Sequence, residues 1–252
     1  MTSQLVLYKA ILAYDGTNFA GFQRQANART IQGEVEAALR KIGWQQDAIL
    51  AAGRTDTGVH AAGQVITFAL AWAHTVRELL NALNAYLPPE IAFQQVEVAH
   101  EPFHPRYDAL SRRYRYTLFS QATRNPLRER FAWRIWLKAD FELLTQAAAL
   151  FVGTYDFRAF GTPPRPGGST TRTVFASQWE QHSASRFSYE IEANAFLYHM
   201  VRRIVRFQVD VATGKLPVES ISLSLTGPPQ DPVIGLAPAH GLTLLAVRYP
   251  EK

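Results

Sequence analysis

The sequence predicts an α+β protein built from two ferredoxin-like halves, each with helices on one face of an antiparallel sheet. Two observations support this prediction. Segments with strand-like and helix-like apolar patterns follow one another in the order β, α, β, β, α, β, and this order occurs twice. A connector at 101–106, which carries prolines and histidine, separates the halves. We therefore expect an N-terminal domain at 1–106 and a C-terminal domain at 107–252.

The first half opens with an apolar, strand-forming run at 5–14, which the Asp15-Gly16 turn ends. Apolar residues then recur at helical spacing over 30–42, and Thr30 is suited to cap that helix.

A second helix of this half follows Thr75, which forms a capping box with Glu78, and Pro88-Pro89 ends it. The remaining strands of the first half are predicted at 48–52, 64–70 and 91–98.

In the second half, Asp140 is predicted to cap an apolar-striped helix that Gly153 ends. The segments at 174–180 and 187–192 alternate like a hairpin. Further strands of this half are predicted at 112–119, 130–136 and 242–248. We expect the loop at 160–171 to be exposed and mobile, and 216–239 to be irregular.

The last long helix is predicted at 194–213, with Phe196 and Leu197 among its inward residues and Gly214 as its stop. On that helix His199, Arg202 and Arg206 would form one stripe opposite the apolar one. Such a stripe could face a substrate, or it could be a solvated helix face.

Composition indicates a globular, cytoplasmic protein. Hydrophobic residues make up 47% of the 252-residue chain, yet no apolar run approaches the ~20 residues that span a bilayer. The opening apolar stretch is interrupted by Lys9 and followed by Asp15, unlike a signal peptide. Because the chain has no cysteine, disulfides, thiolate catalysis and Cys-ligated metal centres are excluded.

The net charge of +5 suits a polyanionic partner. Arginine greatly outnumbers lysine and falls into three clusters, near 106–115, 124–134 and 202–206. In the middle strand, Tyr114 and Tyr116 stand between arginines and could form a platform for stacked bases. Ordinary strand packing and a solvated basic face would give a similar pattern.

The stretch from Gly53 to Ala61, Gly-Arg-Thr-Asp-Thr-Gly-Val-His-Ala, is the strongest candidate for the chemistry. Asp56 lies between Gly53 and Gly58, which permit φ > 0 and so a tight loop. Arg54 is close enough in sequence to keep the carboxylate ionised, as a nucleophile or general base requires. The alternative is an ordinary Asp-Thr-Gly turn without catalytic function.

The motifs bear on three classes of function. An enzyme that acts on RNA through an aspartate nucleophile fits best. An aspartic protease shares Asp-Thr-Gly, but it needs two such aspartates and an apolar run before the motif, and here Arg54-Thr55 precedes it. A pure RNA-binding module fits the fold, but the chain has no RNP1-like strand. The histidine spacing predicts no metal, and there is no P-loop or dinucleotide motif, so we expect no cofactor.

Taken together, these motifs resemble the tRNA pseudouridine synthase A (TruA) family over nearly the whole chain. Asp56 lies in the stretch that is similar to the family's catalytic motif. The other matching segments are Tyr14-Asp15-Gly16 with 19–25 and Ile31-Gln32, Phe103-His104 with Arg106 and Ala109, 112–116, Tyr155-Asp156-Phe157, Arg172-Thr173, Phe196 with 199–202 and Ile204-Val205, and Ala237-Pro238 with Gly241-Leu242.

The resemblance implies a cofactor-free isomerase that converts uridine to pseudouridine in the anticodon stem-loop of tRNAs, at tRNA positions 38 to 40. Asp56 would be the nucleophile, attacking either C1′ of the sugar or C6 of the base. Tyr114 would stack on the target base, Arg202 would pair with Asp56 and help to displace the base, and Arg54 would be an RNA-side or supporting arginine. Flipping the base out of its stack costs a few kcal/mol, which an arginine and a tyrosine can offset.

The resemblance further implies a pseudouridine synthase fold in which the two halves join around a central cleft. It also implies a homodimer that binds tRNA. From the residues themselves we expect no metal and no membrane among its partners. One departure is Tyr198, which stands where a histidine often precedes His199.

Overall fold

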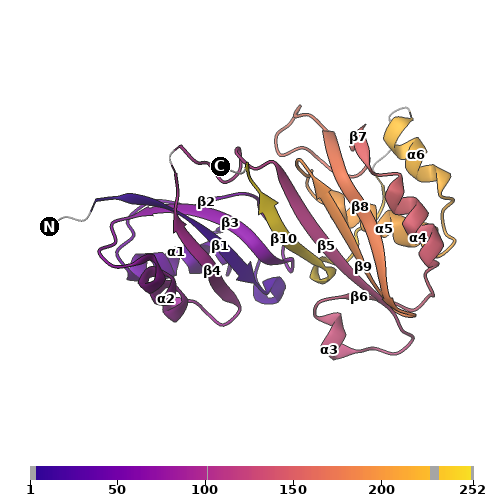
Figure 1. Cartoon of the computed structure of the whole chain (residues 1–252). Helices are drawn as coiled ribbons and strands as arrows, with labels where there is room; N and C mark the ends of the chain where they lie inside the picture. Colours follow the sequence, from indigo (N-terminus) through magenta and orange to yellow (C-terminus); the bar gives the residue numbers. More distant parts are fainter. Residues whose placement is uncertain (1–3, 101, 228–232, 251–252) are drawn as a thin grey trace. The chain divides into compact units, whose positions relative to one another are not determined.

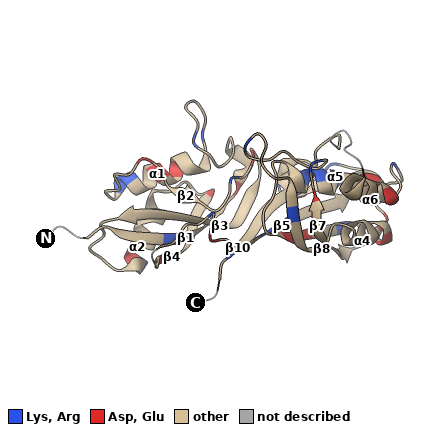
Figure 2. Cartoon of the chain, turned by 90° about the horizontal axis from the view of Figure 1, so that it is seen from above, with Lys and Arg blue, Asp and Glu red and all other residues tan. Residues whose placement is uncertain are grey.

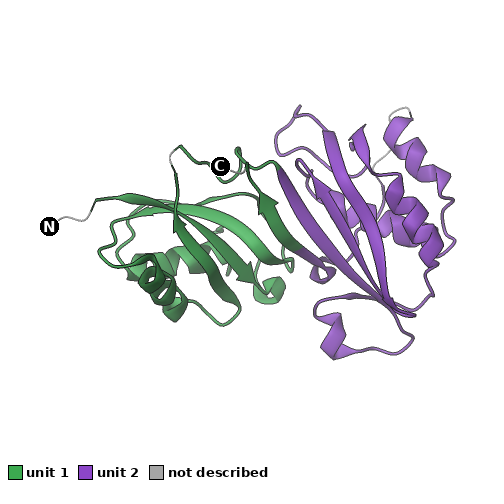
Figure 3. Ribbon diagram, in the orientation of Figure 1, with its two compact units in different colours: residues 1–110, 244–252 green, residues 111–243 purple. Residues whose placement is uncertain are grey.

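The computed structural model describes residues 4–100, 102–227 and 233–250. It divides into two compact units, 1–110 with 244–252 and 111–243 (Figure 3). Both units combine strands with helices, which confirms the α+β class (Figure 1). The ferredoxin-like form of each half stays a prediction, as do the domain limits drawn at residue 106.

The sheet of the first unit is built on β1 (Val6–Tyr14), which pairs antiparallel with β3 (His60–Leu70) and β4 (Ile91–Val98). Alternate residues of β1 are buried, because successive side chains of a strand point to opposite faces. The short β2 (Leu50–Ala51) pairs with β3, and β10 (Leu242–Arg248) also neighbours β3.

Two helices pack together in the first unit, α1 (Ile31–Lys41) and α2 (Val76–Tyr86) (Figure 1). Thr30 caps α1 by accepting a hydrogen bond from the Gly33 backbone, as predicted. The capping box of Thr75 and Glu78 is also present at the start of α2. Local capping chemistry therefore fixed both helix starts.

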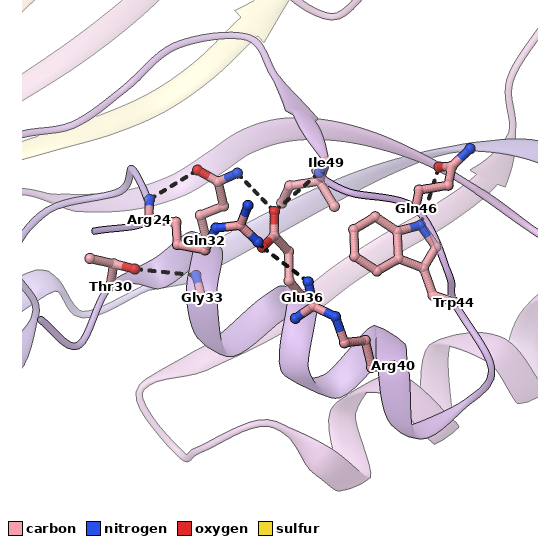
Figure 4. A network of polar contacts seen from close by, with 9 residues as sticks. All are labelled: Arg24, Thr30, Gln32, Gly33, Glu36, Arg40, Trp44, Gln46 and Ile49. Atoms are coloured by element: carbon pink, nitrogen blue, oxygen red, sulfur yellow. Dashed lines mark hydrogen bonds and ion pairs between the residues drawn. The ribbon is translucent and has the colours of Figure 1, made fainter. Parts of the chain in front are cut away.

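A buried carboxylate ties α1 to the loop before it (Figure 4). The Glu36 side chain has no exposed surface and accepts hydrogen bonds from Arg24, from Gln32 Nε2 (2.8 Å) and from the Ile49 backbone (3.2 Å). The Arg24 backbone also donates to Gln32. These bonds satisfy a charge that would be costly to bury alone, and they fix the loop at 15–25 against the helix.

The sheet of the second unit is antiparallel along the order β5-β9-β8-β7. These strands are β5 (Ser111–Ser120), β7 (Gly153–Asp156), β8 (Thr171–Ser183) and β9 (Arg186–Ala193). The hairpin predicted at 174–192 is β8 and β9. The short β6 (Trp133–Ile135) runs parallel to β5 after α3 (Pro126–Glu129).

The helix α4 (Phe141–Ala149) begins where it was predicted, since Asp140 accepts hydrogen bonds from the backbones of Glu142 and Leu143. It ends before Gly153, which opens β7 with φ 127°. It packs against β8 and against α5 (Met200–Ala212).

The predicted start of the last long helix at residue 194 is wrong, because α5 begins at Met200. The backbone before it has other hydrogen-bond partners: Asn194 bonds the Thr173 and Ala195 backbones through its side chain, and Tyr198 pairs with Thr162. The predicted stripe is present only in part. Arg202 and Arg206 lie on α5 and are half-buried among its buried residues, whereas His199 precedes the helix. Arg206 forms an ion pair with Asp210.

The segment at 216–239 is not wholly irregular, since it contains α6 (Glu219–Thr226). Residues 228–232 of this segment and Glu101 of the connector lie outside the described residues. The last strand matches its prediction at 242–248. Two short 3-10 turns complete the described elements, at Gly16–Asn18 and at Ala239–Gly241.

Candidate active site

Asp56 is half-buried on the loop between β2 and β3 in the first unit. A tight turn carries it, because the Val59 backbone donates a hydrogen bond to the Asp56 carbonyl (3.1 Å) and Gly58 has φ 79°. The predicted turn is therefore present. Gly53 does not adopt a positive φ, so only Gly58 uses the left-handed freedom expected of both glycines.

Three hydrogen bonds hold the residues on the N-terminal side of Asp56. Thr55 is buried, and its hydroxyl shares a hydrogen bond of 2.9 Å with the Tyr14 hydroxyl. The Thr55 carbonyl accepts from the Phe22 backbone at 3.0 Å. Gln64 donates to the Gly53 carbonyl at 3.0 Å. The carboxylate of Asp56 thus stands on fixed backbone, as a catalytic group requires.

Two glycines allow the loop at 15–25 to approach the Asp56 turn. A Cβ on Gly21 (φ 88°) would lie 2.9 Å from the Thr55 carbonyl oxygen, and one on Gly16 would lie 2.0 Å from that of Val59. No other residue type fits such close backbone contacts. These positions explain why the first loop carries its glycines there.

His60 is a buried residue beside the turn that the sequence reasoning did not single out. Its Nδ1 accepts a hydrogen bond from the Gly16 backbone at 3.0 Å. The same nitrogen lies 3.1 Å from a carboxylate oxygen of Asp15. Nothing in the local sequence indicates the contact with Gly16, because 44 residues separate the two partners.

Arg54 is exposed on the same loop as Asp56. The structure therefore places both predicted residues of the first half together. The exposure of Arg54 leaves its guanidinium accessible from solvent.

Tyr114 and Arg202 belong to the second unit. Tyr114 is half-buried on β5 and meets the ring of Phe196 edge-on, with centroids 5.1 Å apart. Arg202 lies in the first turn of α5, and its Nε donates to the Ala237 carbonyl at 2.8 Å. The Ala237 backbone returns a hydrogen bond to the Arg202 carbonyl at 3.1 Å. Each side chain is therefore held by a neighbouring segment.

Tyr116 turned out to be structural rather than part of a base-stacking platform. It is fully buried, and its hydroxyl donates to the Pro238 carbonyl at 2.8 Å. Burial raises the pKa of Tyr116 well above its usual value, against a smaller lowering by the charge of Arg202. Of the two tyrosines predicted to stack on bases, Tyr114 alone has exposed surface.

The arginines of β5 are partly neutralised inside the unit. Figure 2 marks the basic and acidic residues of the chain in blue and red. Arg113 and Arg115 both form ion pairs with Glu190 of β9. Burial by itself raises the pKa of Glu190. The hydrogen bonds from Arg115 and Arg113 lower this pKa by more, so it lies below its ordinary value. These two arginines therefore contribute less free positive charge than the sequence suggests.

The described residues contain no group of three or more His, Asp or Glu side chains that could hold a metal. Within the same ranges, none of the helices has the length and apolar character needed to cross a bilayer.

Comparison with known proteins gives one consistent result. A family model described as tRNA pseudouridine synthase matches residues 10–108 and 147–250. A tRNA pseudouridine synthase A from Chloroflexus aurantiacus is 39% identical over 243 residues, covering 95% of this chain and 87% of the relative. One from Pseudothermotoga lettingae is 37% identical over 242 residues, covering 96% and 99%.

Among solved structures, a Cbf5-Nop10-Gar1 complex matches with a TM-score of 0.39 and 11% identity. That match covers 94% of this chain and 49% of the other. Similarity at this level does not indicate which residues form the site.

Proposed function

The chain belongs to the tRNA pseudouridine synthase family, and from this premise we propose that Asp56 is the nucleophile of its reaction. The family is one of isomerases that act on tRNA. We place the target uridines in the anticodon stem-loop, at tRNA positions 38 to 40, because the motifs of this chain resemble those of the tRNA pseudouridine synthase A family.

The proposed reaction balances without a cofactor. The Asp56 carboxylate adds to C1′ of the ribose or to C6 of the uracil, and the bond between C1′ and N1 breaks. The uracil turns, C5 bonds to C1′, and the covalent bond to Asp56 breaks, which frees the carboxylate. The proton on C5 is lost and N1 is protonated, so nothing is oxidised or reduced overall.

The observation that carries the proposal is the fixed backbone on both sides of Asp56. Hydrogen bonds hold the Gly53 and Thr55 carbonyls, and Val59 closes the turn. A nucleophile held in this way loses little conformational freedom when it reacts, and this preorganisation lowers the barrier.

The remaining candidate residues have proposed roles around the same nucleotide. Tyr114 stacks on the flipped uracil, and Phe196 supports its ring. Arg202 helps to displace the base, and exposed Arg54 contacts the RNA beside Asp56. Flipping costs a few kcal/mol, which stacking and cationic contacts offset. We also propose a homodimer, on the resemblance of the motifs, and a cytoplasmic location, on the composition of the chain.

The decisive test is tritium release from tRNA labelled at C5 of uracil. We expect release by the wild type and none by Asp56→Asn, which keeps the side-chain shape and removes the charge. The matched control is Asp47→Asn, an exposed aspartate outside the loop, which should retain wild-type release. Substrates with the label at single positions test the assignment to 38 to 40.

Binding and folding must be measured beside the reaction. Asp56→Asn should bind tRNA with an unchanged dissociation constant and melt at an unchanged temperature. Tritium release by Asp56→Asn at the wild-type rate would refute the nucleophile, and release from none of the three positions would refute the assigned stem-loop.

A further inference from the structure

The second unit carries a pair of stacked rings that the proposed reaction does not use. The rings of Tyr198 and His199 are stacked with their centroids 3.6 Å apart and an angle of 27° between their planes. Tyr198 remains 58% exposed although His199 covers one face of its ring. We propose that Tyr198 and His199 form a stacking platform for an unpaired tRNA base next to the target uridine.

Contacts with Gly161 and Thr162 hold the backbone of this platform. The Tyr198 backbone donates to the Thr162 carbonyl at 3.0 Å and forms an isolated bridge with that residue. A Cβ on Gly161 would lie 2.6 Å from Leu197 Cβ and 2.8 Å from the Tyr198 carbonyl oxygen. Leu197 itself is buried. An exposed aromatic ring on such rigid backbone loses little entropy when it binds a ligand.

His199 is held in a strained conformation. It has φ 66°, and it is the only residue other than glycine with positive φ among those the structure describes. The left-handed region is unfavourable for a side chain with a Cβ, and strain of this kind clusters at functional sites. The backbone at His199 is also held by the start of α5, because the Arg203 backbone donates a hydrogen bond to the His199 carbonyl at 3.0 Å.

The platform lies on the segment that carries the proposed target-base residues. Phe196, two residues before Tyr198, contacts Tyr114, and Arg202 follows three residues after His199. An exposed aromatic face beside arginines is the combination that binds single-stranded nucleic acid. The bases of the anticodon loop are unpaired, and each offers a flat face to Tyr198. The inference rests on the proposed function, since it assigns a second base of that substrate.

The test compares Tyr198→Leu, which removes the ring, with Tyr198→Phe, which keeps it. An anticodon stem-loop RNA carries 2-aminopurine at the nucleotide on either side of the target uridine. We expect wild type and Tyr198→Phe to quench the fluorescence of 2-aminopurine on binding. Tyr198→Leu should bind without quenching this fluorescence. The dissociation constant of Tyr198→Leu should rise about 5- to 150-fold, the range for loss of one stacked base. Melting temperatures should not change, because Tyr198 is largely exposed.

An abasic site in the RNA separates stacking from a merely structural role. Removing the stacked base should raise the dissociation constant of the wild type as much as Tyr198→Leu does. It should not change the dissociation constant of Tyr198→Leu. Equal losses from the abasic site in both proteins, or wild-type quenching by Tyr198→Leu, would overturn the platform. The control is Tyr86→Leu, an equally exposed tyrosine (55%) at the end of α2, which should bind as wild type. Tritium release by the wild type tests the proposed function separately.

Discussion

At the residue scale, the loop that bears Asp56 depends on backbone contacts that only glycine permits. Gly21 combines a positive φ with a close approach to the Thr55 carbonyl, and Gly53 has neither constraint. The two glycines belong to loops that meet beside the same aspartate. They therefore form a matched pair for substitution by alanine.

We expect Gly21→Ala to lower the free energy of unfolding by about 1–3 kcal/mol, because the new Cβ is strained and meets backbone. Gly53→Ala should change it by less than about 1 kcal/mol, since no atom lies within 4 Å of its ideal Cβ. Urea unfolding measures both values. Equal effects of the two substitutions would show that the approach of the first loop does not constrain the Asp56 turn.

At the scale of elements, β5 and β9 share a charge network. Glu190 of β9 is mostly buried and pairs with Arg113 and Arg115, whose side chains are 38% and 47% exposed. Solvent screens those arginines, so the network should stabilise the sheet only modestly. Its contribution nonetheless has a defined dependence on pH.

The folded-state pKa of Glu190 lies below its ordinary value of 4.5. Its stabilisation is therefore fully present above that value and is lost as the pH falls through the lower, folded-state pKa. We expect Glu190→Gln to cost about 1 kcal/mol at neutral pH, with the difference from wild type shrinking on acidification below pH 4.5.

Urea unfolding of both proteins over a pH series measures this difference. Glu180→Gln on β8, whose side chain is 73% exposed, is the control and should show no comparable loss. A Glu190→Gln difference that stays constant into acid would mean that packing, not the ion pairs, sets the effect.

At the scale of the whole molecule, the four predicted site residues are divided between the two units. Asp56 and Arg54 belong to the first, and Tyr114 and Arg202 to the second. If they act on one nucleotide, as we propose, substitutions in different units should not be independent. A double-mutant cycle tests this without any assumption about geometry.

We expect Arg54→Ala and Arg202→Ala each to lower kcat/KM for tRNA, and their combination to deviate from additivity by about 0.5–3 kcal/mol. Tritium release gives kcat/KM, and melting temperatures identify any loss of folding after Arg202 leaves Ala237. Effects that add to within about 0.5 kcal/mol would mean that the two arginines act on separate parts of the RNA.

The sequence by itself determined the elements whose signals are local. Thr30, Thr75 with Glu78, and Asp140 cap the helices they were predicted to cap, because a cap needs only three or four consecutive residues. The turn at Asp56 was predictable for the same reason, and the family followed from the combination of motifs. The site roles remain proposals, since no local signal reports what a side chain does to a substrate.

Only the tertiary structure decided where the last long helix begins and what surrounds Asp56. The apolar spacing continues through residue 194, but hydrogen bonds with Thr162 and Thr173 hold the backbone outside the helix until Met200. Likewise, Tyr14 contacts Thr55 beside Asp56, and His60 contacts Gly16. More than 40 residues separate the partners in each pair. Such contacts depend on how the chain returns on itself, and periodicity along the sequence does not encode that path.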